Sequence, residues 1–195
     1  MPYQILNNYT LVLGSNSPRR KQFLHDLGLT FVVRASDIDE IYPHELQGAA
    51  ITDYIAKLKA DAIALTDERE ILITSDTTVW HEGQSLGKPL DRQDAIEMLT
   101  SLSGKAHEVI TSICLKTQQK EHVFHVVTAV HFKPLSLEQI EYYIDQYKPY
   151  DKAGAYGIQE WIGLVGIERI NGSYTNIVGL PTTELMEELL HFIKD

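Results

Sequence analysis

Hydrophobic and polar positions alternate in blocks along the first half of the chain, and the blocks differ in their period. Short apolar runs at Leu11–Leu13 and Ile71–Ile73 predict buried strands, and Thr30–Val33 predicts a further strand. Ala49–Leu65 instead repeats apolar residues at helical spacing, and Arg92–Leu102 predicts another helix that ends near a glycine. Strands that alternate with helices are typical of an α/β fold.

The second half has an antiparallel pattern. Val109–Leu115 and Val123–Phe132 are rich in β-forming residues and are joined by the polar segment Lys116–Glu121, which predicts a hairpin. The other expected elements are a helix capped at Ser136, a strand over Ile162–Ile170, a tight turn at Asn171-Gly172 and a helix over Pro181–Ile193. No repeat or linker interrupts the chain. We therefore expect a single α/β domain over residues 1–195, with a mixed twisted sheet in two lobes around a central cleft.

Composition and charge narrow the classes of partner. The 195 residues are 44% hydrophobic and 23% charged, as in a folded domain with a substantial core. The formal net charge of −10 argues against nonspecific binding to nucleic acid or to an anionic membrane. Cys114 is the one cysteine, no apolar stretch approaches the length of a bilayer span, and the N-terminus lacks a signal pattern. These features predict a cytoplasmic location.

The segment from residue 11 to residue 29 carries the strongest local signal. After the predicted strand, small residues lead to a helix start, where Ser17 is placed as the N-cap and Pro18 as the first helical residue. A strand, a small-residue turn and a helix N-terminus form an anion site. Arg19 and Arg20 are cations at a helix start, where they oppose the dipole unless an anion such as a phosphate chain lies between them.

The alternative is that both arginines are solvated surface residues. The two interpretations differ in what alanine variants should do. If the arginines bind phosphate, each variant should lower kcat/KM by about tenfold to over a hundredfold. Thermal stability should then stay level or rise slightly, because removing a cation relieves the conflict with the helix dipole.

Two further positions in the sequence offer candidate catalytic or metal-binding carboxylates. Asp76 comes directly after the predicted strand Ile71–Ile73, in the polar run from Thr74 to Thr77. Ligand sites of α/β sheets gather at such strand ends, so Asp76 is a candidate Mg²⁺ ligand or base. Its alternative role is to cap a loop turn. Glu40 belongs to an acidic cluster with Asp37 and Asp39, which is either a source of oxygen ligands for a divalent cation or a solvated loop.

Three further residues are weaker candidates from position alone. Lys59 lies on the predicted helix and Lys88 lies in a glycine-containing turn, and both could be surface lysines. Gln159 ends the glycine-rich segment 151–159 and offers both a donor and an acceptor, as reading a nucleobase edge requires. The glycines of this segment indicate a backbone that passes close to a ligand, or a tight crossover without one.

With these pieces placed, the chain resembles the Maf family of nucleoside triphosphate pyrophosphatases over nearly its whole length. The resemblance rests on the ordered motifs G-S-N-S-P-R-R, S-D-T-T-V, L-G-K-P, L-S-G-K-A-H-E-V-I-T, D-K-A-G-A-Y-G-I-Q and I-N-G-S-Y-T-N-I-V-G-L-P. It implies an inosine-triphosphatase-like fold and hydrolysis of a nucleoside triphosphate between the α and β phosphates, with a divalent cation, Mg²⁺ or Mn²⁺. It also implies a homodimer.

The resemblance also implies roles for particular residues. Five residues match family positions that hold the triphosphate: Ser15, Arg19, Arg20, Lys59 and Lys88. Asp76 matches the catalytic aspartate, and Glu40 matches an acidic residue near the metal and the attacking water, so both are expected at the metal. Arg19, Thr77 and Gln159 match positions of the branch that prefers dTTP and UTP. Gly14 departs from the alanine of many relatives and could loosen the turn.

The function expected from this resemblance is hydrolysis of dTTP and UTP to the nucleoside monophosphate and pyrophosphate. Modified pyrimidine nucleotides are further candidate substrates. Two alternatives remain open at this point. One is a non-catalytic nucleotide-binding regulator of septum formation and cell division. The other is a phosphohydrolase that releases single phosphates.

Overall fold

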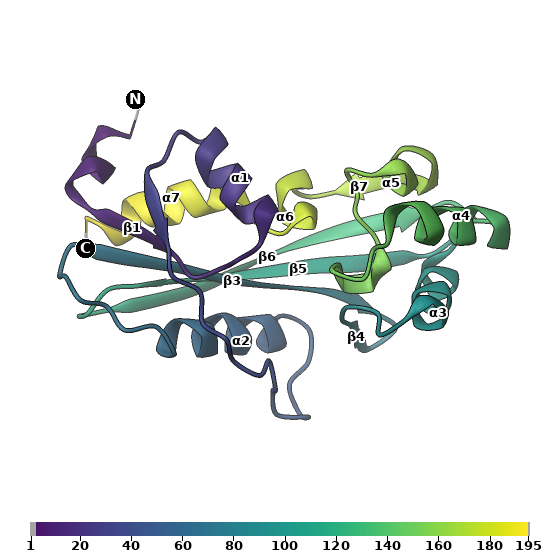
Figure 1. Cartoon of the computed structure of the whole chain (residues 1–195), viewed down its shortest axis with the longest axis horizontal. Helices are drawn as coiled ribbons and strands as arrows, with labels where there is room; N and C mark the ends of the chain where they lie inside the picture. The colour runs from purple at the N-terminus through teal and green to yellow at the C-terminus, as the bar shows by residue number, and fades with distance from the viewer. Residues whose placement is uncertain (1–2, 195) are drawn as a thin grey trace. The chain divides into compact units, whose positions relative to one another are not determined.

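A mixed α/β fold is present in the computed structural model, which describes residues 3–194 (Figure 1). Its strands form a seven-stranded sheet with the order β2-β1-β3-β5-β6-β7, and β4 pairs with β3. β1 is parallel to β2 and β3, whereas β3–β4 and β6–β7 are antiparallel. The strands are β1 (Thr10–Leu13), β2 (Phe31–Val33), β3 (Glu70–His81), β4 (Gln84–Leu86), β5 (Ala106–Lys116), β6 (Glu121–Phe132) and β7 (Ile167–Asn171).

The helices lie between and after these strands. They are η1 (Gln4–Asn8), α1 (Pro18–Asp26), α2 (Ala49–Asp61), α3 (Arg92–Leu102), α4 (Leu137–Tyr147), η2 (Ala153–Ala155), α5 (Trp161–Gly166), α6 (Tyr174–Val178) and α7 (Thr182–Phe192). Within residues 3–194, no helix combines the length and the apolar character that a membrane span requires.

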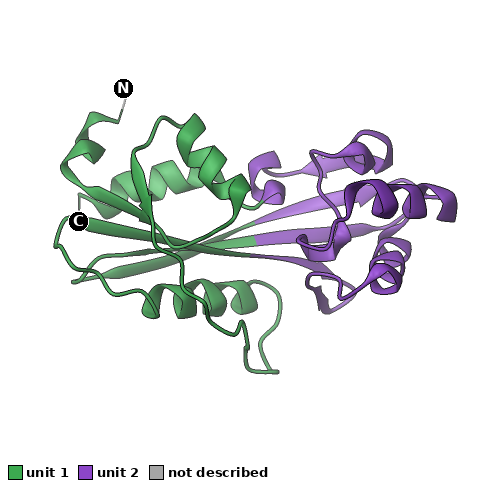
Figure 2. Ribbon diagram, in the orientation of Figure 1, with its two compact units in different colours: residues 1–76, 111–126, 179–195 green, residues 77–110, 127–178 purple. Residues whose placement is uncertain are grey.

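The chain divides into two compact units, and the division falls within β3, β5 and β6 (Figure 2). Unit 1 contains residues 1–76, 111–126 and 179–195, and unit 2 contains residues 77–110 and 127–178. The predicted mixed α/β architecture is confirmed. The predicted cleft and the single functional domain stay predictions.

The core of unit 1 follows from the two-residue period of its strands. In β1, Leu11 and Leu13 pack with α1 and α7, whereas Val12 packs on the opposite face with α2. β3 repeats the pattern, since Ile71 and Ile73 join the first cluster and Leu72 joins the second. Successive side chains of a strand point to opposite faces. Both faces of these strands are therefore buried, as is typical of a parallel sheet covered by helices on both sides.

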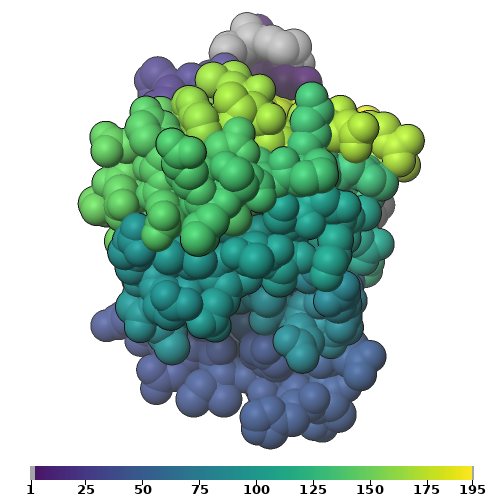
Figure 3. All heavy atoms as spheres, turned by 90° about the vertical axis from the view of Figure 1, so that its right-hand side faces the viewer, coloured from purple at the N-terminus to yellow at the C-terminus, as the bar shows by residue number. Residues whose placement is uncertain are grey.

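Unit 2 has its own core. Val79, Val109 and Val130 pack with residues of α3 and α4, including Leu99 and Tyr143. On the face seen in Figure 3, α3 in teal and α4 in green contribute neighbouring parts of the surface. An ion pair joins the two helices there, with 2.9 Å between Arg92 Nε and Asp145 Oδ1.

Most predicted elements are confirmed, including the hairpin of β5 and β6 and the capping box at Ser136. Three predictions are wrong. β3 continues to His81, so the polar run from Thr74 to Thr77 is strand. The first half of Ile162–Ile170 lies in α5, and only its second half lies in β7. Asn171-Gly172, predicted as a tight turn, instead forms a bend that leads into α6. A Cβ built on Gly172 would lie only 2.7 Å from Thr128 Oγ1.

The glycine-rich segment owes one of its glycines to packing. Gly154 has a φ of +66°, and a Cβ built on it would lie 2.8 Å from Val79 Cγ2 of β3. Its N–H donates to the carbonyl of Gly87 at 3.0 Å, which ties the segment to the bend that holds Lys88. For Gly154, the tight-crossover interpretation is therefore sufficient, and no ligand is needed to explain it.

We expect Gly154→Ala to destabilise the protein by about 2–4 kcal/mol, because the left-handed backbone and the crowding against Val79 both oppose a Cβ. Gly87→Ala is the matched control, since a Cβ there meets nothing within 4 Å. Urea unfolding of both variants measures the difference. Equal losses in the two variants would contradict this explanation.

Candidate functional site

The turn between β1 and α1 has the predicted helix cap. The Ser17 side chain accepts from the backbone N–H of Arg20 at 3.5 Å, and Pro18 occupies the first helical position. Ser15 Oγ accepts from the Ser17 N–H at 3.2 Å. Two hydroxyl groups thus organise the helix start, where the unsatisfied N–H groups and the dipole favour an anion.

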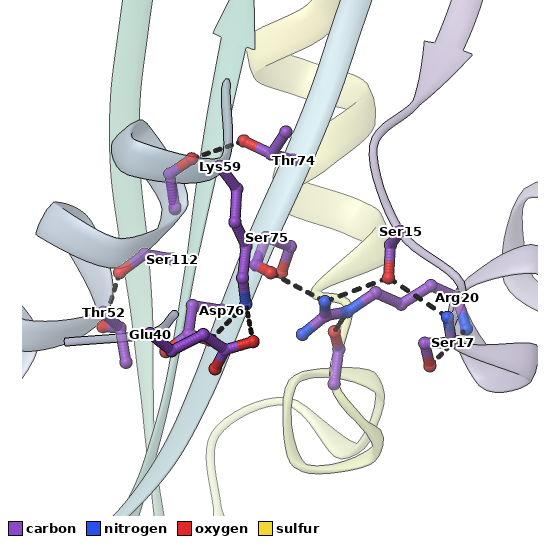
Figure 4. A network of polar contacts seen from close by, with 12 residues as sticks. Ser15, Ser17, Arg20, Glu40, Thr52, Lys59, Thr74, Ser75, Asp76 and Ser112 are labelled. Atoms are coloured by element: carbon purple, nitrogen blue, oxygen red, sulfur yellow. Dashed lines mark hydrogen bonds and ion pairs between the residues drawn. The ribbon is translucent and has the colours of Figure 1, made fainter. Parts of the chain in front are cut away.

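Arg20 is fixed to the protein on several sides (Figure 4). Its guanidinium donates to the carbonyl of Gly179 at 2.9 Å, to the carbonyl of Ser75 at 2.7 Å and to Ser15 Oγ at 3.3 Å. Burial lowers the pKa of this guanidinium, and the Asp76 carboxylate opposes that shift. The interpretation of Arg20 as a solvated arginine is therefore wrong. These contacts argue against the expectation that stability stays level or rises slightly when Arg20 is removed, because Arg20 joins three segments of unit 1.

Gly14 is packed tightly beside the same turn. Its N–H donates to the Ile73 carbonyl at 2.8 Å, and a built Cβ would lie 2.5 Å from Thr74 Cγ2. In this chain the glycine therefore leaves room for the side chains of Thr74, Ile63 and Leu72. This packing argues against the expectation that Gly14 could loosen the turn, because the residue is buried in contact with its neighbours.

Asp76 lies inside β3, not after it as predicted, and only 7% of the residue is exposed. Its Oδ1 accepts from Lys59 Nζ at 2.8 Å, and the same ammonium lies 2.9 Å from Glu40 Oε1 (Figure 4). Burial raises the pKa of the Asp76 carboxyl above its ordinary range. The positive charge and hydrogen bond of Lys59 act against this rise, whereas the charge of Glu40 adds to it.

Buried hydroxyl groups hold α2 in the position that brings Lys59 to Asp76. Thr74 Oγ1 on β3 donates to the Ala56 carbonyl of α2 at 2.6 Å. One turn earlier, Thr52 Oγ1 and Ser112 Oγ of β5 share a hydrogen bond of 2.6 Å. Sequence reasoning missed these positioning residues. Their signal was the presence of hydroxyl side chains at buried positions of otherwise apolar elements, where such groups need a partner.

The structure joins five of the predicted site residues in one network within unit 1: Ser15, Arg20, Glu40, Lys59 and Asp76. Arg19 lies on the first turn of α1 in the same unit and is half-buried. The interpretation of Lys59 as a surface residue is wrong, since its side chain is 13% exposed.

The other three predicted residues belong to unit 2. Thr77 follows Asp76 in β3 and is half-buried. Lys88 is exposed in the bend after β4, and Gln159 is exposed just before α5. Their roles stay predictions.

The two carboxylates of the site, Asp76 and Glu40, are compatible with a divalent cation that the substrate also helps to hold. Within residues 3–194, no three His, Cys, Asp or Glu side chains form a metal-ligand cluster. Asp76 and Glu40 nevertheless place two carboxylates around a single ammonium group. Mg²⁺ commonly takes one or two protein carboxylates and completes its shell with water and substrate phosphates. These two residues therefore fit such an ion.

We expect Arg20→Ala to lower the free energy of unfolding by about 2–3 kcal/mol, because hydrogen bonds to a charged group contribute about 1.5–3 kcal/mol each. Arg20→Lys should recover only part of the loss, because an ammonium lacks the planar fork that reaches both carbonyls. Lys21→Ala, a cation on the same helix, is the control. Urea unfolding in the absence of nucleotide provides the measurement, and an unchanged midpoint for Arg20→Ala would refute the structural role.

The Lys59 network predicts opposite shifts in two variants. In metal-free protein, the Asp76 carboxyl should titrate above its ordinary value of 3.8. Lys59→Met removes the positive charge and should raise the Asp76 pKa further, whereas Glu40→Gln removes a negative charge and should lower it. Carbon-13 NMR of labelled aspartate, titrated in the presence of a chelator, follows these changes. Shifts of the same sign in both variants would contradict the arrangement.

Comparison with known proteins agrees with the resemblance seen in the motifs. The family model described as "Maf-like protein" matches residues 10–192. A "dTTP/UTP pyrophosphatase" of Flavobacterium johnsoniae is 53% identical over 94% of this chain and 95% of its own. A protein of the same name from Bacteroides fragilis is 54% identical over 94% of this chain and 96% of its own.

Among solved structures, the Staphylococcus aureus Ham1 protein aligns with a TM-score of 0.48 and 15% identity, covering 92% of this chain and 99% of that one. The family model spans nearly the whole chain and the relatives exceed half identity, so the protein belongs to the Maf family.

Proposed function

We propose that this protein hydrolyses dTTP and UTP, and modified pyrimidine nucleotides of the same class, to the nucleoside monophosphate and pyrophosphate. The observation that carries the proposal is the network of unit 1. In it, the buried Asp76 contacts Lys59, and Arg20 at the start of α1 donates to the carbonyl of Ser75, next to Asp76. The names of the similar proteins from Flavobacterium and Bacteroides support the same substrates.

The phosphate chain is the part of the substrate that this network suits. Ser15, Arg19, Arg20, Lys59 and Lys88 are proposed to hold it. Arginine binds phosphate through a planar fork, and lysine acts as a compact point charge. Because Arg20 is already held by two carbonyls and Ser15, its cation needs little reorganisation when a phosphate arrives.

Asp76 and Glu40 are proposed as the catalytic carboxylates. A water molecule attacks the α-phosphorus, the new P–O bond forms, and the bond between this phosphorus and the bridging oxygen breaks, which releases pyrophosphate. One of the two carboxylates takes the proton of the water. A base with a raised pKa is better matched to proton transfer near neutral pH. Burial gives Asp76 that property, and Lys59 keeps its ionised form accessible.

A divalent cation, Mg²⁺ or Mn²⁺, is part of the proposal, with Asp76 and Glu40 as its protein ligands. When bound, it would neutralise charge on the phosphates and on the leaving pyrophosphate. Lys59 contacts both carboxylates, so its ammonium balances their charge within the protein.

Arg19, Thr77 and Gln159 are proposed to select the pyrimidine base. We further propose that residues 1–195 work as one functional domain in the cytoplasm and as a homodimer. The substrate is a small nucleotide, with no nucleic-acid or membrane partner, in keeping with the net charge of −10. A regulator that only binds nucleotides would gain nothing from a buried carboxylate beside its phosphate-binding cations, so Asp76 favours the enzyme.

Incubation of the purified protein with dTTP or UTP and Mg²⁺ should yield pyrophosphate and the monophosphate, and separation of the products identifies them. Asp76→Asn should lower turnover by about 10²–10⁴-fold, because the amide cannot accept the proton. Asp26→Asn, an exposed aspartate on α1, is the matched control. Orthophosphate as the first product, preference for purine triphosphates, or near wild-type turnover in Asp76→Asn would each refute the corresponding part of the proposal.

A further inference from the structure

A buried polar network in unit 2 supports the segment that ends at Gln159. The Tyr143 hydroxyl on α4 donates to Glu160 Oε2 and accepts from the N–H of Gly157 at 3.0 Å. Glu160 Oε1 lies 3.1 Å from Lys152 Nζ, which also donates to Asp151 Oδ1 at 2.7 Å. Tyr143 has no exposed surface, and the Lys152 and Glu160 side chains are 10% and 19% exposed.

Forming this network is less favourable in free energy than forming a simple crossover without buried charges. It buries a charged lysine and a carboxylate, which is unfavourable unless both are paired. The backbone it supports is also strained, because Ala155 has a φ of 58° directly after the left-handed Gly154. Strain of this kind persists only where the surroundings hold it in place. Such a cost is expected where the position of a neighbouring group matters.

Gln159 lies two residues after Gly157, whose backbone N–H this network holds. Between residues 152 and 160 it is the one exposed residue, in a segment that is otherwise buried or half-buried. The turn is closed by the Glu160 N–H, which donates to the Gly157 carbonyl at 3.0 Å. A Cβ built on Gly157 would lie 3.0 Å from Gln159 Nε2 and 2.9 Å from Glu160 Cδ, so both side chains lie over this glycine.

A glutamine does not discriminate between uracil and cytosine by its chemistry alone. Uracil and thymine present an acceptor beside a donor, and cytosine presents the reverse order. A freely turning amide can match either, since rotation exchanges its oxygen and nitrogen. Discrimination therefore needs an amide whose position and orientation are set by its surroundings. Fixing a glutamine side chain in advance also saves about 1.5–2 kcal/mol of rotamer entropy on binding.

We propose that Tyr143, Glu160 and Lys152 are positioning residues that hold Gln159 in the arrangement selecting uracil and thymine over cytosine. The inference rests on the proposed function, in which Gln159 contacts the base. None of the three residues needs to touch the substrate. Tyr143 and Glu160 act through the backbone of Gly157 and the turn it begins, and Lys152 balances the Glu160 charge.

The test compares kcat/KM for UTP with kcat/KM for CTP, and the ratio of the two is the uracil preference. Tyr143→Phe should lower this preference about tenfold, since it removes one hydrogen bond to a charged group and one to the backbone. The kcat for UTP should stay within about twofold, because the phosphate site of unit 1 is untouched. Glu160→Gln should lower the preference in the same way, and it serves if Tyr143→Phe folds poorly.

Tyr147→Phe is the matched control, because its ring stacks on that of Tyr143 at 5.2 Å but its hydroxyl lies outside the network. Its uracil preference should equal that of the wild type. Loss of activity toward UTP and CTP in equal proportion in Tyr143→Phe and Glu160→Gln would indicate a structural role and overturn the proposal.

Gln159→Ala separates this proposal from the one on which it rests. Loss of preference in Gln159→Ala but not in Tyr143→Phe or Glu160→Gln overturns the positioning network alone. An unchanged preference in Gln159→Ala overturns base reading by Gln159 and the network with it, while pyrophosphate release by the wild type still stands. Absence of pyrophosphate from UTP with the wild type refutes the proposed function itself.

Discussion

A buried carboxylate is the constraint on which the site depends. Asp76 lies in the middle of β3, where an isolated charge would be strongly unfavourable. Lys59 supplies the compensating charge, and buried hydroxyl contacts at Thr52 and Thr74 help to fix α2, which carries Lys59, against the sheet. Burial and pairing act on Asp76 in opposite directions, which leaves a carboxylate with a raised pKa that is still held by a cation.

The same logic applies to the cations of the site. An arginine at a helix start is unfavourable by itself, yet Arg20 has hydrogen bonds to two carbonyls and to Ser15. It stabilises the junction of three segments and presents positive charge at the end of β1. One side chain therefore combines this structural role with the phosphate-binding role proposed for it. The sequence offered two roles for Arg20, phosphate binding or a solvated surface position. It did not offer the third role, which is to join segments of the fold.

Unit 2 repeats the principle with a different set of residues. Lys152 and Glu160 are largely buried and balance each other, and Tyr143 connects the pair to the backbone at Gly157. Gly154 approaches Val79 too closely for any side chain, which fixes the beginning of the same segment. The segment thereby presents an exposed glutamine on a backbone with little freedom.

The sequence by itself determined the fold class, most elements and the helix cap at Ser17, because these depend on local periodicity and on turn and cap chemistry. The motifs indicated the family that the comparisons confirmed. Only the tertiary structure decided that β3 runs through Asp76, that α5 replaces half of an expected strand, and that Lys59 contacts two carboxylates. Each of these depends on contacts between residues far apart in the chain. Local propensity contains no information about which charge will be buried or which partner will compensate it.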